Sequence, residues 1–372
     1  MIRRLFASIA AMLAAISIVT VGSPAFADDI RDRQWHLKSL NIADVHSIST
    51  GRGVTVAVID SGVSNHRDLS GSVLAGKDFT DSSGSGQTDT NGHGTAMAGD
   101  IAAHGKGESG ALGIAPDSKI LPVRVLTTGK TGRGLGPAIS WAVTHGADVI
   151  NISLGGGATP DLFSALEAAE KANVVVVASA GNLPESHGIT SPAFVPSVVA
   201  VGAVDRDGKR ASVSASGAAL DLMAPGTDIM STSVHNQYAA GTGTSDAAAI
   251  VSGAAALIRS KYPALSAREV VARLESTAID KGAPGVDPEY GHGVIDLVAA
   301  LSTDAPVATD QPSASPSPAD SIPQANYSPS GDSAAASATQ SSGRSSLLFG
   351  IAAMLAVLGG LAAFLILRRR RN

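Results

Sequence analysis

The stretch Val54-Thr-Val-Ala-Val-Ile-Asp-Ser-Gly-Val63 joins a short apolar run to an acidic residue. A near-continuous run of β-branched residues is typical of a strand that is covered on both faces of a sheet. Asp60 follows the run directly, and ligands of parallel sheets gather at the carboxyl ends of the strands. The stretch therefore predicts a buried strand whose end carries a functional carboxylate.

Similar runs recur along the chain and alternate with Ala-rich segments of helical length. The other predicted strands are residues 120–125, 149–152, 174–178 and 198–201, and the clearest helical segments are 136–145 and 160–173. Strands that alternate with helices are typical of an α/β domain with a mainly parallel central sheet.

Three more polar residues stand where a predicted element begins or ends. Asn91-Gly-His93-Gly-Thr95 opens an Ala-rich helix, and Ser179-Ala-Gly-Asn182 closes the predicted strand 174–178. Ser245 opens the helix in Gly-Thr-Gly-Thr-Ser-Asp-Ala-Ala-Ala-Ile-Val-Ser-Gly (241–253). These side chains can meet in space although they are far apart in sequence.

The four residues suit attack on a carbonyl group. A serine hydroxyl becomes a nucleophile when an imidazole takes its proton and a carboxylate fixes that imidazole, which are the roles predicted for Ser245, His93 and Asp60. The amide of Asn182 and the backbone N–H of Ser245 would stabilise the oxyanion.

Each residue also has an ordinary structural explanation. Asp60 could close a turn or bind a ribose, His93 could be a surface loop residue, Ser245 could be an N-cap, and Asn182 could belong to a turn. The joint occurrence of all four at element ends, in the order Asp, His, Asn, Ser, favours catalysis.

At this point the sequence resembles the subtilases, the subtilisin-like serine peptidases. The similar motifs are VAVIDSGV, NGHGTAMAG, VVASAGN and GTGTSDAAAIVSG, with LMAPGTDIMST (222–232) and YGHGVID (290–296) beyond them. The resemblance runs from about residue 34 to residue 301. It implies a subtilisin-like three-layer fold and endopeptidase activity through an acyl-enzyme.

The resemblance also implies where the substrate binds. An extended peptide would pair beside Ser153, Leu154 and Gly155 like an added strand, and Ala180 and Gly181 would help to form the side-chain pocket. Glu185 could favour a basic side chain there, but the sequence does not decide the specificity.

The rest of the chain predicts a membrane-anchored, exported protein. The segments are a signal peptide (1–27), an N-terminal segment (28–52), the peptidase domain (53–302), a Ser/Pro/Ala-rich disordered linker (303–346), a transmembrane helix (347–367) and a cytoplasmic Arg tail (368–372). A cell-wall sorting signal would end similarly, but no LPxTG-like motif precedes residue 347. We therefore expect a single-pass type I protein with its catalytic domain outside the cell.

Composition excludes several kinds of partner and site. All 32 acidic residues lie in residues 28–346, which leaves that region with a net charge near −11 and argues against nucleic acid. There is no cysteine, so disulfides and thiolate metal sites are excluded. Dinucleotide binding is disfavoured because Gly51 and Gly53 precede the first strand instead of following it.

The order of segments resembles that of the mycosins, membrane-anchored subtilases associated with type VII secretion. The resemblance implies a peptidase that processes proteins at such a system, with components of a secretion complex as possible partners. The alternative is a scaffold of weak or no activity that stabilises a membrane secretion complex.

Two acidic residues raise further questions. The family's serine motif usually has Met where this chain has Asp246, which could stabilise the helix dipole or raise the pKa of His93. The predicted chemistry needs no cofactor, and no metal site is predicted. Asp68 resembles a calcium ligand of some subtilases, but its companion ligands cannot be placed.

Overall fold

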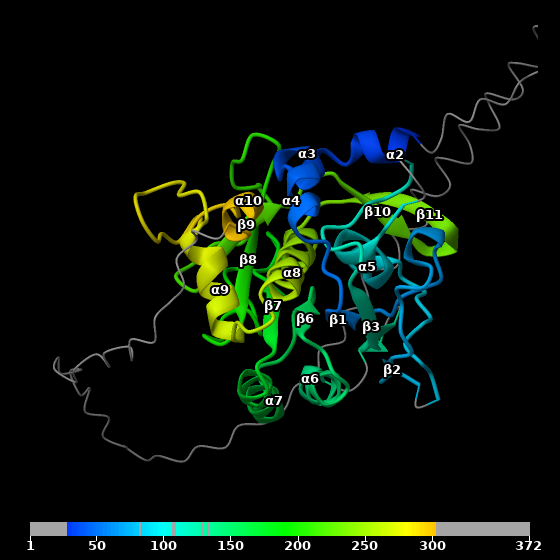
Figure 1. Cartoon of the computed structure of the whole chain (residues 1–372). Coiled ribbons are helices and arrows are strands. Elements are labelled where there is room, and N and C mark those ends of the chain that lie inside the picture. Colours follow the sequence, from blue (N-terminus) through cyan, green and yellow to red (C-terminus); the bar gives the residue numbers. More distant parts are fainter. Residues whose placement is uncertain (1–27, 82, 106–108, 128–129, 132–133, 303–372) are drawn as a thin grey trace, which may run out of the picture. The chain divides into compact units, whose positions relative to one another are not determined.

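The computed structural model describes residues 28–302 except 82, 106–108, 128–129 and 132–133 (Figure 1). The predicted signal peptide, linker, transmembrane helix and tail lie outside the described residues. Within the described part, no helix combines the length and the apolar composition that crossing a membrane requires.

A seven-stranded sheet forms the centre of the described domain, and every neighbouring pair in it is parallel. The strands, in spatial order, are β2 (Lys77–Asp78), β3 (Lys119–Arg124), β1 (Thr55–Asp60), β6 (Val149–Ile152), β7 (Val175–Ser179), β8 (Val199–Val204) and β9 (Leu222–Pro225). The predicted α/β class and parallel sheet are confirmed.

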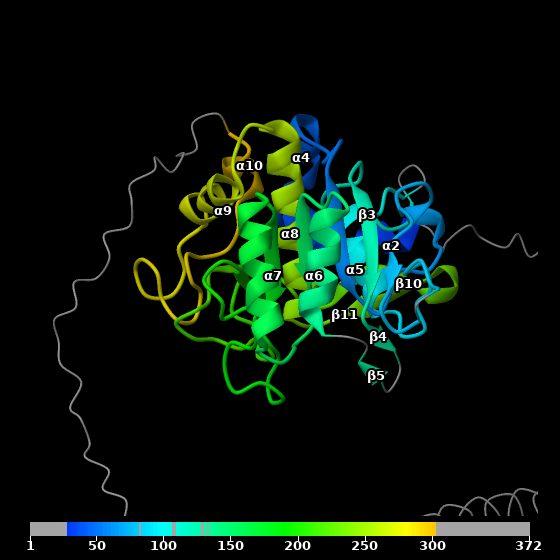
Figure 2. The same cartoon turned by 90° about the horizontal axis from the view of Figure 1, so that it is seen from below.

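Helices cover both faces of the sheet and make it the middle of three layers (Figure 2). One face carries α5 (His93–Ala102) and α8 (Thr244–Lys261), and the other carries α6 (Leu135–Thr144) and α7 (Pro160–Lys171). Alternation along β1 explains why both faces are apolar. Val56 and Val58 join the core with α5 and α8, whereas Ala57 and Ile59 join the core with α6 and α7.

The remaining elements lie around this sandwich. They are α2 (Asp28–Arg33), α3 (Trp35–Ser39), α4 (Ile42–Ile48), the 3-10 turns η2 (Arg67–Leu69) and η3 (Val234–Asn236), the hairpins β4 (Leu126–Thr127) with β5 (Lys130–Thr131) and β10 (Ile229–Ser233) with β11 (Gln237–Gly241), α9 (Ala267–Ser276) and α10 (Leu297–Ala300).

The segment 28–52 is part of the same folded unit as the predicted peptidase domain. Its apolar side chains Leu37 and Val45 belong to the core cluster that contains α5 and α8. The buried amide of Gln34 donates to the carbonyls of Leu112 and Met230, each at 3.0 Å. Gln34, which lies between α2 and α3, therefore connects the segment after α5 to β10.

Helix α8 runs through the core and positions the predicted nucleophile. Its residues from Ala247 to Ile258 are buried, most of them completely, and many are small. Asn151 of β6 fixes the helix to the sheet, because its side chain accepts from Ser252 at 3.0 Å and donates to Ser153 at 3.1 Å. The start of α8 is thus held at the carboxyl edge of the sheet.

Candidate active site

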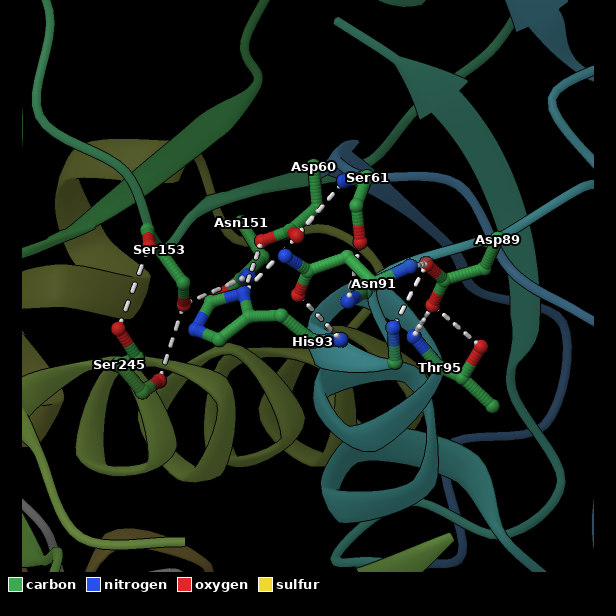
Figure 3. A network of polar contacts seen from close by, with 11 residues as sticks. Asp60, Ser61, Asp89, Asn91, His93, Thr95, Asn151, Ser153 and Ser245 are labelled. Atoms are coloured by element: carbon green, nitrogen blue, oxygen red, sulfur yellow. Dashed lines mark hydrogen bonds and ion pairs between the residues drawn. The ribbon is translucent and has the colours of Figure 1, made fainter. Parts of the chain in front are cut away.

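The structure brings Asp60 and His93 into direct contact (Figure 3). Asp60 is the last residue of β1 and is completely buried, and His93 is the first residue of α5. The Nδ1 atom of His93 lies 2.9 Å from each carboxylate oxygen of Asp60. This contact fixes the imidazole so that Nε2 is left for a substrate or a nucleophile.

Close backbone packing makes that contact possible. A Cβ atom at Gly94 would lie only 2.2 Å from the carbonyl oxygen of Gly62, so only glycine lets the start of α5 approach the end of β1 so closely. The N–H of Gly94 donates to the Ser61 hydroxyl at 2.9 Å. The glycine after His93 is therefore required by geometry.

Asp89 organises the loop that delivers His93. One of its oxygens accepts from the backbone N–H groups of Asn91 and Gly92, both at 2.8 Å. The other accepts from the backbone and the hydroxyl of Thr95, at 3.0 and 2.7 Å. One buried carboxylate thus joins the loop before α5 to the first turn of the helix.

Ser245 lies in the first turn of α8, as the sequence predicts, and it faces Ser153 (Figure 3). Its hydroxyl donates to the carbonyl of Ser153 at 3.2 Å, and the Ser153 hydroxyl donates to the carbonyl of Ser245 at 2.9 Å. Hydrogen bonds between nucleophile and base often tighten only when substrate is bound. In the predicted role, the Ser245 hydroxyl must release the Ser153 carbonyl and donate to Nε2 of His93 instead.

Asn182 is held from the same helix start. Its Oδ1 accepts from the backbone N–H and the hydroxyl of Thr244, at 2.9 and 3.1 Å. The Thr244 hydroxyl in turn accepts from the N–H of Gly181 at 3.2 Å. With Oδ1 used in this way, Nδ2 is the atom that Asn182 presents as a donor, which suits its predicted role at an oxyanion.

The electrostatics at His93 favour its protonated form. The Asp60 carboxylate is the largest cause that raises the pKa of His93 to about 9, burial opposes it, and Asp246 and Asp89 raise the pKa further. A base must be neutral to accept a proton, so this site suits catalysis at alkaline pH.

A cavity of about 280 Å³ lies beside Ser245. It is lined by Ser153, Gly155, Ser179, Gly181, Asn182, Glu185, Ser186, Thr190 and Ser245. Three of the predicted substrate-binding residues, Ser153, Gly155 and Gly181, are in this lining.

Leu154 and Ala180 are not among the lining residues of the cavity. Leu154 packs against the core on the α6 and α7 face, and Ala180 is completely buried. The backbone of Ala180 is also engaged, since its N–H donates to Val201 and its carbonyl accepts from Thr190, both at 2.9 Å. Their role in binding an extended substrate therefore stays a prediction.

Comparison with known proteins gives the site its context. The family described as Subtilase family (Peptidase_S8) matches residues 51–293. Subtilisin DY of Bacillus licheniformis is 45% identical over 258 residues, which cover 67% of this chain and 91% of that protein. The chain belongs to the subtilase family. Subtilisin E of Bacillus subtilis is 44% identical over 262 residues, which cover 68% of this subtilase and 66% of subtilisin E.

Solved structures similar to this subtilase include mycosins. MycP1 from Mycobacterium smegmatis has a TM-score of 0.69 and 30% identity, covering 79% of this subtilase and 90% of that chain. MycP3 protease from the type VII (ESX-3) secretion system has a TM-score of 0.62 and 34% identity. The match covers 73% of this subtilase and 88% of the MycP3 chain. This subtilase is thus a subtilisin-family serine endopeptidase that is mycosin-like by structure.

Asp68, the residue that resembles a calcium ligand, makes hydrogen bonds within this subtilase. One oxygen of Asp68 accepts from the Tyr238 hydroxyl at 2.7 Å and from the N–H of Ala111 at 2.8 Å. In the part of the chain that the structure describes, no three His, Cys, Asp or Glu side chains group together as metal ligands would.

Some site residues were not predicted from the sequence. Asp89 could have been found, because an Asp shortly before a helix commonly accepts from backbone N–H groups two and three residues further along the chain. Ser186 and Thr190 could not, because they reach the cavity from an irregular segment between β7 and β8 whose path depends on tertiary packing.

Proposed function

We propose that this subtilase is a membrane-anchored, extracellular serine endopeptidase that processes proteins at a type VII-like secretion system. The Asp60–His93 contact at the carboxyl edge of the sheet is the observation that carries the catalytic part. The likeness to MycP1 from the ESX-1 type VII secretion system, with a TM-score of 0.70 over 78% of this chain, supports the cellular part.

In the proposed mechanism, His93 takes the proton of the Ser245 hydroxyl as Ser245 attacks the scissile carbonyl carbon. Asp60 stabilises the imidazolium that forms, and Asn182 with the N–H of Ser245 stabilises the oxyanion. His93 then gives its proton to the leaving amine, and water releases the acyl group by the reverse steps.

The cavity beside Ser245 would receive the substrate side chain on the amino side of the scissile bond. Its lining includes the hydroxyls of Ser179, Ser186 and Thr190 and the exposed carboxylate of Glu185. Hydroxyls and a carboxylate favour polar or basic groups over large apolar ones. In a peptide library we expect Lys or Arg to be preferred at this position, and Glu185→Gln to reduce that preference a few-fold.

Covalent labelling tests the catalytic part directly. A fluorophosphonate probe should label the purified protein at Ser245, and both Ser245→Ala and His93→Ala should abolish labelling. Ser164→Ala, a change to a hydroxyl on α7 that donates only to Pro160, is the matched control and should label normally. Asn182→Ala should lower the labelling rate by about 100-fold to 1000-fold, the loss known for one such donor in a subtilisin.

Separate experiments test the anchor and the secretion role. Deletion of residues 347–367 should move the protein from the membrane fraction to the medium. In the native cell, Ser245→Ala should remove specific new N-termini from secreted proteins. If secretion fails when the whole protein is lost but is normal with Ser245→Ala, and no N-termini change, the scaffold alternative is favoured instead.

A further inference from the structure

Two buried carboxyl groups near the active site have no role in the mechanism above. Asp246 follows Ser245 in the first turn of α8 and is only 4% exposed. Asp100 lies on α5, about two turns beyond His93, and is completely buried. Because α5 packs against α8, the two carboxyls lie near each other in the same protein interior.

Asp100 has little compensation for a negative charge, because the neighbouring Ser231 hydroxyl lowers its pKa only against larger opposing effects. Neither of its oxygens has a hydrogen-bond partner among the described residues. The hydroxyl of Ser231 lies beside it, but this hydroxyl donates to the Ala96 carbonyl at 2.8 Å. Burial first, and then the charge of Asp246, raise the pKa of Asp100 well above its ordinary value. A buried, unpartnered carboxyl of this kind keeps its proton.

Asp246 is confined in a different environment. A Cβ atom at Gly241 would lie 2.4 Å from one carboxylate oxygen of Asp246, so the group is packed tightly against the β11 backbone. Burial raises the pKa of Asp246 to about 7, while the positive charge of protonated His93 lowers it. Asp246 therefore has a nearby cation, which Asp100 lacks.

The charges that act most strongly on His93 come from three parts of the fold. They are Asp60 on β1, Asp89 in the loop before α5, and Asp246 on α8. Other charged groups on elements packed against α5 have partners of their own: Asp68 with Tyr238 and Arg67, and Arg124 with Asp78 at 2.9 Å. All three groups acting on His93 are carboxylates, and only Asp246 is next to the nucleophile.

We propose that Asp246 is a positioning residue that shares one proton with His93, and that Asp100 remains a neutral acid beside it. The proposal rests on the proposed function of His93 as the base. When the proton is on His93, Asp246 is charged and His93 cannot accept the proton of Ser245. When the proton is on Asp246, His93 is neutral and can act as the base.

The resting position of Ser245 fits the first of these two forms. An imidazolium donates from both nitrogens and cannot accept a hydrogen bond. The Ser245 hydroxyl accordingly donates to the Ser153 carbonyl at 3.2 Å. A substrate in the proposed mode, with an N–H that takes over this carbonyl, would free the hydroxyl to turn towards His93.

The proposal predicts that activity rises with pH in two steps. At low pH both His93 and Asp246 are protonated. Loss of one of these two protons gives a mixture in which only the form with neutral His93 is active, so the rate reaches an intermediate plateau. Loss of the second proton leaves His93 neutral in every molecule. The plateau should lie below the final rate by a factor of ten for each pKa unit by which the proton prefers His93 over Asp246.

The experiment measures the second-order rate of fluorophosphonate labelling of the purified full-length protein as a function of pH. Wild type should show two steps. Asp246→Asn and Asp246→Met should show a single step, moved to lower pH by about one unit because a carboxylate next to His93 has been removed. Asp100→Asn keeps a neutral group of the same shape and should retain both steps. Glu167→Gln, on the exposed face of α7, controls for the change in net charge.

Each contrary outcome has a distinct meaning. A single step in wild type, or two steps that persist in both Asp246 variants, would overturn the shared proton. A shifted profile in Asp100→Asn would overturn the neutral state of Asp100. If folded wild type does not label at any pH, the proposed function itself fails.

A spectroscopic measurement covers the case in which the Asp246 variants do not fold. Infrared spectra at neutral pH should show the carbonyl stretch of a buried, protonated carboxylic acid in wild type. Asp100→Asn should weaken this band and Glu167→Gln should not. An unchanged band in Asp100→Asn would show that the protonated acid is a different residue.

Discussion

Asp60 and Asp89 are buried and accept hydrogen bonds from the donors around them, whereas the buried Asp100 accepts none from the described residues. Asp60 contacts His93 and accepts from the N–H of Ser61 at 2.7 Å, and Asp89 accepts four hydrogen bonds. Both oxygens of Asp100 are unpartnered. The comparison teaches that burial alone does not determine the charge of an acid: the donors that the fold supplies decide whether it serves as an anion or remains a neutral acid.

The largest effect is expected when the charge of Asp60, a carboxylate with hydrogen-bond donors around it, is removed. Asp60→Asn should lower kcat/KM by about 10³-fold to 10⁴-fold, because the amide no longer fixes the His93 tautomer or stabilises the imidazolium. The measurement is the rate of fluorophosphonate labelling or peptide hydrolysis at a pH above the His93 titration. Asp207→Asn, an exposed acid, is the control. Retention of more than a tenth of the activity in Asp60→Asn would contradict the predicted triad.

Asp89 should matter for both stability and activity. In Asp89→Ala, the donors of Asn91, Gly92 and Thr95 lose their acceptor, and the unfolding free energy should fall by about 2 to 4 kcal/mol. Urea denaturation measures this loss. Activity at a temperature where the variant is folded should also fall, because the loop that places His93 has lost its tether. A variant of unchanged stability would show that water replaces the carboxylate without cost.

Much of the fold could be predicted because it depends on local patterns. The predicted strand 54–59 corresponds to Thr55–Asp60, and the helical segment 160–173 corresponds to Pro160–Lys171, because continuous apolar runs and helical periodicity are properties of short segments. The four predicted site residues were found at element ends for the same reason. The resemblance to a family with ordered motifs supplied the layer architecture that periodicity alone does not give.

The environment of Asp100 could not be predicted in this way. Its proximity to Asp246 depends on how α5 and α8 cross, and 145 residues of chain lie between the two. On α5 alone, Asp100 is one polar residue in an apolar helix with no sign of its burial. The pairing of buried polar groups is a property of packing between elements, which the sequence of either element does not contain.

His36 is a buried base that, like the acid Asp100, has no hydrogen-bond partner among the described residues. This residue of α3 is completely buried, and among the described residues neither ring nitrogen has a hydrogen-bond partner. Burial lowers the pKa of His36 to about 3 from an ordinary 6.5. The unfolded chain therefore binds a proton that the folded protein does not, and stability falls as the pH decreases below about 6.5.

Replacing His36 should remove this acid sensitivity. From pH 7.5 to pH 5, wild type should lose about 2 kcal/mol more unfolding free energy than His36→Leu does, since each unit below 6.5 costs about 1.4 kcal/mol. Chemical denaturation at the two pH values measures the difference. Leu and His differ in packing, so the test is the change with pH and not the absolute stability. An equal pH dependence in the two proteins would mean that His36 reaches water or a partner in solution.

Asp100→Asn should change stability in the opposite pH range. Because the pKa of Asp100 is raised in the folded state, the unfolded chain loses its proton first, and wild-type stability falls as pH rises above the ordinary Asp range. Asn cannot ionise in either state. The variant should therefore gain on wild type by about 1.4 kcal/mol for each pH unit above about 4 over which Asp100 stays protonated, as measured by urea denaturation at pH 3.5 and pH 8. A variant less stable than wild type at pH 8 would mean that Asp100 is ionised and compensated, and the distinction between the two kinds of buried acid would fail. Opposite slopes for His36 and Asp100 would show that one physical cause, burial without a partner, acts on a base and on an acid with opposite signs.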